Sequence, residues 1–340
     1  MRGKRTGRQT WSFSCVEVLA GAAIGGPKEG QGPLWDRFDI VKDDELMGMR
    51  SWEQAEMCLM EEAARLAVLK AGLRPDQVDF MLAGDLLNQI ICCNFTARNL
   101  SLPFLGLFAA CATFAEAVAI GSLIIEGGFG GSVLAASCSH NKTAERQYRY
   151  PVEQNVQRAL TAHWTATASG AVLLGVTGGR VRVTHATIGE VVDLGVKNPN
   201  DMGSAMAPAA AKTISAHFAD TGRSPRDYDL VVTGDLGEFG TALMRELLFE
   251  EGIDMMDRLA DCGLMIFDKK QDVHAGGSGA GCSASVFAGH LLRELEAGRL
   301  NRILLVGTGA LFSPTSYQQG ESIPCVAHAV AVERLEGGKS

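Results

Sequence analysis

Short, mostly apolar segments recur along the chain and are bounded by glycine, proline and polar residues. Residues 78–82, 133–137, 170–174 and 302–306 are segments of this kind. Continuous apolar runs of this length are typical of strands that helices cover on both faces of a sheet. The pattern therefore predicts an α/β layered protein.

The longest apolar stretch covers residues 100–125, and Glu116 is its only charged residue. Its length would suit a membrane-spanning helix, but Pro103 and Gly106 interrupt it. We therefore expect a strand at about 105–110 and a buried helix at about 112–126. Because a buried carboxylate is costly without a partner, we expect Glu116 to be paired, to lie at an interface or to act in function, with a structural partner as the first hypothesis.

The chain also contains an internal repeat. Residues 71–85 match residues 221–235 in register, and residues 111–137 match residues 282–308 after an insertion in the second copy. Each copy shows a helix that ends at glycine, a turn containing proline, a buried strand and a Gly-Asp pair. The repeat predicts two similar halves, at 1–200 and 201–340, with an inserted loop at about 138–168 in the first half.

Composition and charge argue against several classes of partner and site. The net charge is −8, and basic residues form no cluster after the basic first ten residues, which argues against nucleic acid as a partner. The nine cysteines are scattered without a C-x-x-C pair, so neither a disulfide framework nor a zinc ribbon is expected. The apolar segment near the start contains Glu17, and we expect neither a signal peptide nor a transmembrane helix.

The sequence Ala109-Ala110-Cys111-Ala112 stands between the predicted strand and the predicted buried helix. Together with the duplicated halves, it resembles the thiolase fold, in which the nucleophilic cysteine lies at the start of a buried central helix. The turn itself is similar to that of the ketoacyl synthase III enzymes. The resemblance implies an αβαβα layered arrangement of two duplicated halves, with Cys111 at the nucleophile position.

Five segments carry a closer resemblance, to the stage V sporulation protein AD family: residues 82–89, 143–151, 201–211, 274–279 and 308–314. The resemblance implies a spore or forespore protein, peripheral to the inner spore membrane. It also implies binding of dipicolinic acid, with or without calcium, and cooperation with the SpoVA membrane proteins, while the thiolase resemblance implies a homodimer. No cofactor is expected. No EF-hand spacing is present, so we expect no metal site of the protein's own, and calcium would arrive with the ligand.

Cys111 allows three interpretations. A helix N-terminus lowers the pKa of a thiol and can hold an anion, which suits either acyl transfer or carboxylate binding; the third interpretation is a small buried side chain. Ketoacyl synthase III enzymes place a histidine after the second-half strand and an asparagine before the second-half helix. Here residues 232–237 contain no histidine, and Ala280 or its neighbours replace the asparagine. We therefore expect a binding protein, with a Cys111-dependent acyl transferase or condensing enzyme as the alternative and a structural partner of the membrane channel as a third hypothesis.

Several polar residues are candidates for the ligand site. The predicted ligand-binding residues are Cys111, Asp85, Asn88, Thr113, Thr165 and Ser283. Asp85 and Asp235 occupy equivalent strand ends, and Asp85 either contacts the ligand or caps a nearby turn. His163 and His274 are the weaker catalytic candidates. The polar segment 140–157 is expected either to border the pocket or to form a solvated loop or a dimer contact; its candidate side chains are Arg146, Tyr148, Arg149 and Tyr150.

Overall fold

The computed structural model describes residues 3–148 and 158–335. Its strands form a large sheet in which two five-stranded halves meet at β3 and β10. The first half has the order β3-β9-β7-β5-β6 and the second the order β10-β15-β14-β11-β12. When the five strands of each half are numbered 1 to 5 along the chain, their spatial order across the sheet is 1-5-4-2-3 in both halves. The strands are β3 (Glu17–Gly25), β5 (Phe80–Gly84), β6 (Phe104–Gly106), β7 (Ser132–Ser139), β9 (Ala168–Gly175), β10 (Val181–Ile188), β11 (Leu230–Thr233), β12 (Leu259–Asp261), β14 (Arg302–Ala310) and β15 (Cys325–Arg334).

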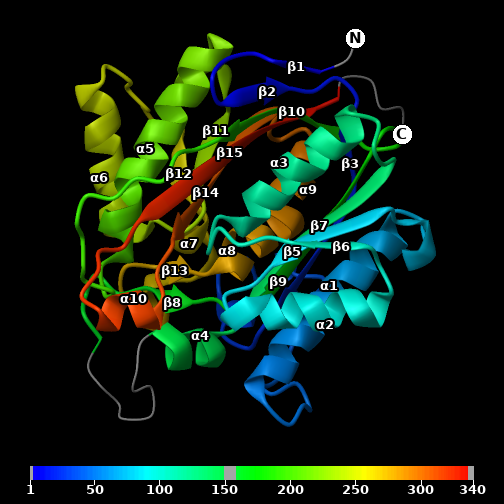
Figure 1. Cartoon of the computed structure of the whole chain (residues 1–340), viewed down its shortest axis with the longest axis horizontal. Helices are drawn as coiled ribbons and strands as arrows, with labels where there is room; N and C mark the ends of the chain where they lie inside the picture. Colours follow the sequence, from blue (N-terminus) through cyan, green and yellow to red (C-terminus); the bar gives the residue numbers. More distant parts are fainter. Residues whose placement is uncertain (1–2, 149–157, 336–340) are drawn as a thin grey trace.

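Helices form three layers around these two half-sheets (Figure 1). The first half-sheet is covered on its outer face by α1 (Trp52–Lys70) and α2 (Ile91–Leu100). The second is covered by α5 (Met202–Thr221), with α6 (Gly237–Glu250) packed beside it. Between the half-sheets lie α3 (Thr113–Glu126) and a second helical segment, α8 (Ala280–Val286), which continues through a π-helical turn into α9 (Leu292–Glu296). The αβαβα arrangement expected from the sequence is confirmed.

The shorter elements connect or edge these layers. They are β1 (Lys4–Arg5), β2 (Thr10–Ser12), β4 (Ile40–Val41), α4 (Asn141–Tyr148), β8 (Trp164–Thr165), α7 (Cys262–Ile266), β13 (Gly277–Ser278) and α10 (Pro314–Gln318). None of the described helices is both long and apolar enough to cross a membrane.

Capping residues explain where the long outer helices begin and end. The Ser51 side chain accepts a hydrogen bond from the N–H of Gln54 at the start of α1, and Asp201 caps α5 through Ser204. Gly222 follows α5 with a φ of 68°, a left-handed conformation that ends helices and favours glycine. The predicted succession of helix, glycine, proline turn and buried strand is therefore present in both copies.

Three predicted boundaries differ from the structure. The expected strand at 105–110 ends at Gly106, because the chain turns at Ala110 before α3 begins. The expected loop at 138–168 contains helix α4 and strand β8, while 149–157 lie outside the described residues. Strand β10 occupies the place in the second half-sheet that β3 occupies in the first, so the second structural copy begins before residue 200.

Glu126, the last residue of α3, fastens the N-terminal segment to the middle layer. Its carboxylate accepts hydrogen bonds from the N–H and the hydroxyl of Ser14 at 2.7 and 2.6 Å, from the N–H of Cys15 at 3.1 Å, and from the N–H of Gly3. Partial burial disfavours the charged form, but these hydrogen bonds outweigh it and lower the pKa of Glu126 to about 2. An ionised Glu126 therefore stabilises the folded state.

We expect Glu126→Gln to lower the free energy of unfolding at pH 7 by about 1 kcal/mol, because it weakens several hydrogen bonds to a charged group that solvent partly screens. The pKa of Glu126 is lower in the folded state than in the unfolded state. Its contribution to the free energy of unfolding is therefore complete above about pH 4.5 and is lost as the pH falls toward 2. Urea unfolding of both proteins between pH 2 and 7 measures the difference. Glu250→Gln, at an exposed position of α6, serves as the control; a wild-type-to-variant difference that does not change with pH would contradict the assignment.

Candidate functional site

A tight turn presents Cys111 at the start of helix α3. Ala110, the preceding residue, has a φ of 50°, a strained conformation for a residue with a side chain. The Thr113 hydroxyl fixes this turn, since it donates to the carbonyl of Ala110 at 2.7 Å and accepts from the N–H of Ala109 at 2.9 Å. Thr113, predicted to face a ligand, is fully buried and uses its hydroxyl to hold the turn.

Strand β14 supports the turn from the second half. A Cβ atom at Gly309 would stand 2.1 Å from the carbonyl oxygen of Ala109, closer than any side chain can approach. Glycine at position 309 therefore allows the Cys111 turn to lie directly on β14. The site is thus built at the contact between the two halves.

The second half also supplies the group that faces Cys111. Asp235, which follows β11, is 1% exposed, and its carboxylate accepts hydrogen bonds from the Thr308 hydroxyl at 2.7 Å and from the N–H of Gly279 at 3.0 Å. The Cys111 thiol is hydrogen-bonded to the same carboxylate. Burial raises the pKa of the Asp235 carboxyl, whereas the hydrogen bonds from Thr308 and Cys111 oppose that rise.

Burial and the pairing with Asp235 both favour the protonated form of Cys111. Burial, followed by the negative charge of Asp235 and the hydrogen bond to it, raises the pKa of the Cys111 thiol well above its ordinary value. Hydrogen bonds from Gly279 and Ser278 oppose this rise but are smaller. Cys111 is therefore a thiol at neutral pH, whereas the nucleophile of an acyl-transfer enzyme must be a thiolate.

Neither candidate histidine lines the cavity beside Cys111. His163 is 2% exposed, and its Nε2 lies 3.2 Å from the carbonyl oxygen of Leu236. His274 has a φ of 53°, and its ring nitrogens lie 2.7 Å from the carbonyl oxygen of Ala159 and 3.1 Å from Asp272. Among the described residues that line the cavity beside Cys111, no histidine is present to act as a general base.

Two neighbouring cavities adjoin the turn and share Phe312 in their walls. The cavity beside Cys111 measures about 30 Å³, room for little more than ordered water. The second cavity, beyond Phe312, measures about 340 Å³. The polar side chains at the first are Cys111, Thr165 and Ser278, and those at the second are Asn88, Gln89, Gln147 and Ser313. No charged side chain lines either cavity among the described residues.

The structure brings together part of the predicted ligand site. Cys111 and Thr165 line the smaller cavity and Asn88 the larger one. Ser283 is buried in α8, and its hydroxyl has no hydrogen-bond partner in the described part of the chain. Asp85 accepts hydrogen bonds from the N–H groups of Leu87 and Cys93, each at 2.9 Å. The structure therefore supports the capping interpretation of Asp85 and does not bring Asp85, Thr113 or Ser283 to either cavity.

Two further candidates from the sequence, Arg146 and Glu116, line neither cavity. Arg146 pairs with Glu53 and lies over the ring of Trp52 at 5.4 Å, while Arg149 and Tyr150 fall outside the described residues. Tyr148 is the last residue of α4. Glu116 is half-buried, and burial raises its pKa. Its Oε2 atom has no hydrogen-bond partner among the described residues. The structural partner expected for Glu116 is therefore not found in the described part of the chain.

Three residues that shape the site were not among those predicted from the sequence. Asp235, Ser278 and Phe312 surround Cys111 from the second half. The repeat contained a usable signal for Asp235, because it aligned that residue with Asp85 at a strand end. Ser278 and Phe312 lie outside the two matched repeat segments on which the alignment rested.

A duplicated αβαβα fold with a cysteine at the start of the central helix defines a thiolase-like protein. A solved variant of OleA from Xanthomonas campestris superimposes with a TM-score of 0.62 at 18% identity and covers 96% of this chain and 100% of its own. The 3-oxoacyl-[acyl-carrier-protein] synthase III of Aquifex aeolicus VF5 gives a TM-score of 0.58 at 13% identity, with 94% and 99% coverage. At these identities the similarity establishes the fold.

Sequence similarity then identifies the family. Residues 7–333 match the stage V sporulation protein AD family. Stage V sporulation protein AD of Bacillus subtilis (strain 168) is 49% identical over 335 residues, which cover 98% of this chain and 99% of that protein. The chain belongs to the stage V sporulation protein AD family, as its sequence motifs indicated.

We expect Asp235→Asn to increase the reactivity of Cys111, because it removes the negative charge that holds the thiol protonated. Each unit by which the pKa falls raises the thiolate fraction about tenfold. Iodoacetamide labelling at about pH 8, followed by peptide mass spectrometry, should show roughly tenfold faster modification of Cys111 in the variant. The double variant Asp235→Asn/Cys111→Ser controls for labelling of other cysteines. An unchanged labelling rate in a folded Asp235→Asn protein would show that Asp235 does not govern the thiol.

Proposed function

We propose that the chain binds dipicolinic acid, with or without calcium, at the Cys111 site and supports its movement into and out of the spore core. Membership of a sporulation family supports the biological setting. In this proposal the protein works with the SpoVA membrane proteins at the inner spore membrane, as a peripheral component and a homodimer. The site then serves recognition and transport instead of catalysis.

The pairing of Cys111 with Asp235 is the observation that carries the proposal. A buried carboxylate that keeps the thiol protonated is the opposite of what nucleophilic catalysis requires. The cavity lining provides no histidine in the described part of the chain. Because the described lining beside Cys111 offers no histidine but keeps a small polar cavity, recognition of a ligand is the function that fits it best.

The composition of the cavity walls fits a flat aromatic acid. Met206 and Phe312 offer apolar surface for a pyridine ring, and Cys111, Thr165 and Ser278 offer polar atoms for its carboxylates. A buried dianion without a cation is unfavourable, so calcium held by the ligand would compensate its charge where the walls provide none. The cavity beside Cys111 is too small for a whole dipicolinate, and we infer that Phe312 moves so that the ligand occupies both cavities.

Calorimetric titration of dipicolinate, with and without calcium, into the purified protein tests this proposal. We expect binding to the wild type and a roughly five- to tenfold weaker affinity for Cys111→Ala and for Thr165→Val, because each removes one hydrogen bond worth about 1 kcal/mol. Ser283→Ala is the matched control, since Ser283 is buried nearby in the middle layer but lines neither cavity. Absence of binding to folded wild-type protein in both conditions would overturn the proposal and favour a purely structural role beside the membrane proteins.

Acyl transfer by Cys111 is the alternative, favoured by the enzymes that share the fold. One solved structure of a cysteine-to-serine variant of Xanthomonas campestris OleA contains bound lauric acid and lauroyl-CoA. We expect no acyl adduct on Cys111 when the present protein is incubated with acetyl-CoA or lauroyl-CoA, because the thiol is not ionised. Intact-protein mass spectrometry measures the adduct. A stable mass increase of one acyl group that disappears in Cys111→Ala would establish the acyl-transfer alternative.

A further inference from the structure

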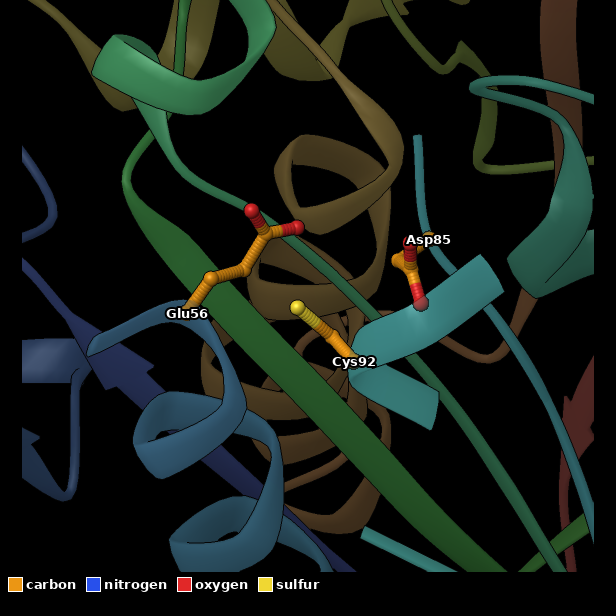
Figure 2. Close-up of side chains that lie close together, drawn as sticks. All are labelled: Glu56, Asp85 and Cys92. Carbon is orange, nitrogen blue, oxygen red and sulfur yellow. The ribbon is translucent and has the colours of Figure 1, made fainter. Parts of the chain in front are cut away.

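A second group of reactive side chains is buried on the outer side of the first half-sheet. Glu56 comes from α1, Asp85 follows β5, and Cys92 lies in the first turn of α2. One potential ligand atom from each lies within 4.8 Å of the other two, and Figure 2 shows the three side chains converging from these elements. Glu56 and Asp85 are 0% exposed and Cys92 is 2% exposed.

A fourth donor, Cys138 on β7, adjoins the same cluster. The Cys138 sulfur lies 3.6 Å from Oε1 of Glu56, and its thiol is also in hydrogen-bond contact with the thiol of Cys92. The Thr143 hydroxyl donates to Oε2 of Glu56 at 2.6 Å and so orients that carboxyl group. Two carboxylates and a thiol therefore converge in a buried site, and the thiol of Cys138 adjoins them at Glu56 and Cys92.

The charge in this cluster is not compensated by the protein. No lysine, arginine or histidine in the described part of the chain pairs with Glu56 or Asp85; their partners are backbone N–H groups, a hydroxyl and thiols. Burial, followed by the negative charge of Asp85, raises the pKa of Glu56 to about 8. Two buried carboxylates this close require either a proton or a cation between them.

We propose that Glu56, Asp85, Cys92 and Cys138 form a binding site for a divalent transition-metal ion of the zinc type. Sulfur donors combined with carboxylates suit zinc, whereas calcium and magnesium prefer oxygen donors alone. In a tetrahedral zinc site each donor stands about 2.0–2.3 Å from the ion, so the four side chains would draw closer together when the ion binds.

Binding is an exchange of protons for the ion. Asp85, which accepts two backbone N–H hydrogen bonds, binds as a carboxylate; Glu56 loses its O–H proton, and Cys92 and Cys138 lose their S–H protons as the metal–oxygen and metal–sulfur bonds form. The three protons pass to the solvent when the divalent ion binds, and no oxidation or reduction occurs. The ion would fasten α1, α2, β5 and β7 together and hold residues 86–90, which follow Asp85 and contribute to the walls of both cavities.

The test uses the full chain, reduced and stripped of metal with a chelator. We expect one Zn²⁺ per chain in competition titrations with a chromophoric chelator, and no binding of Ca²⁺ at this site. Co²⁺ used as a probe should give the intense near-ultraviolet absorption of cobalt–thiolate bonds. Cys92→Ser and, separately, Glu56→Gln should each weaken Zn²⁺ binding by roughly tenfold or more and remove the rise in melting temperature that Zn²⁺ produces in the wild type.

Cys58→Ser is the matched control, since Cys58 lies on the same helix α1 but faces Glu62 outside the cluster; its Zn²⁺ affinity should equal that of the wild type. Two variants are used so that misfolding of one, judged by circular dichroism, leaves the other to decide. Failure of the wild type to bind Zn²⁺, or Zn²⁺ binding that both folded variants retain undiminished, would overturn the proposal and leave a shared proton as the occupant of the cluster.

Discussion

The close approach of the two half-sheets to the helices between them is the constraint on which this structure depends. A Cβ atom at Gly170 of β9 would stand 2.1 Å from the backbone of Ala284 in α8, and Gly309 is equally close to the turn before α3. Small residues at such contacts let two duplicated halves share a single middle layer. The high glycine content of the chain has this role, in addition to its role in turns.

The same close packing determines the chemistry of the site. Because β14 lies against the turn before α3 and Asp235 follows β11, Cys111 meets the buried Asp235 of the second half. In this environment burial and a neighbouring negative charge act in the same direction on the thiol. At the position where the thiolase fold carries a nucleophile, this chain has a cysteine whose pKa burial and Asp235 both raise.

The two halves also use equivalent residues differently. Asp235 and Asp85 occupy matching strand ends, yet Asp235 faces Cys111 beside a cavity, whereas Asp85 meets Glu56 and Cys92 on the outer side of its sheet. The backbone repeat fixes where an aspartate stands, while the helices packed on each half decide what surrounds it. The two sites thus share a scaffold position and differ in their donors.

Local features of the sequence were sufficient to predict the layered α/β class, the duplication, the helix that begins after Cys111 and the family, because these follow from periodicity, from glycine and proline positions and from motifs. Of the residues they proposed for the ligand site, Cys111 and Thr165 line the smaller cavity. The packed structure was needed to show that burial and Asp235 raise the pKa of Cys111, that Thr113 holds the turn and that Phe312 lines two cavities. Those outcomes depend on which half packs against which and on the burial that results, and a local pattern or a repeat records no distance between segments so far apart in the chain.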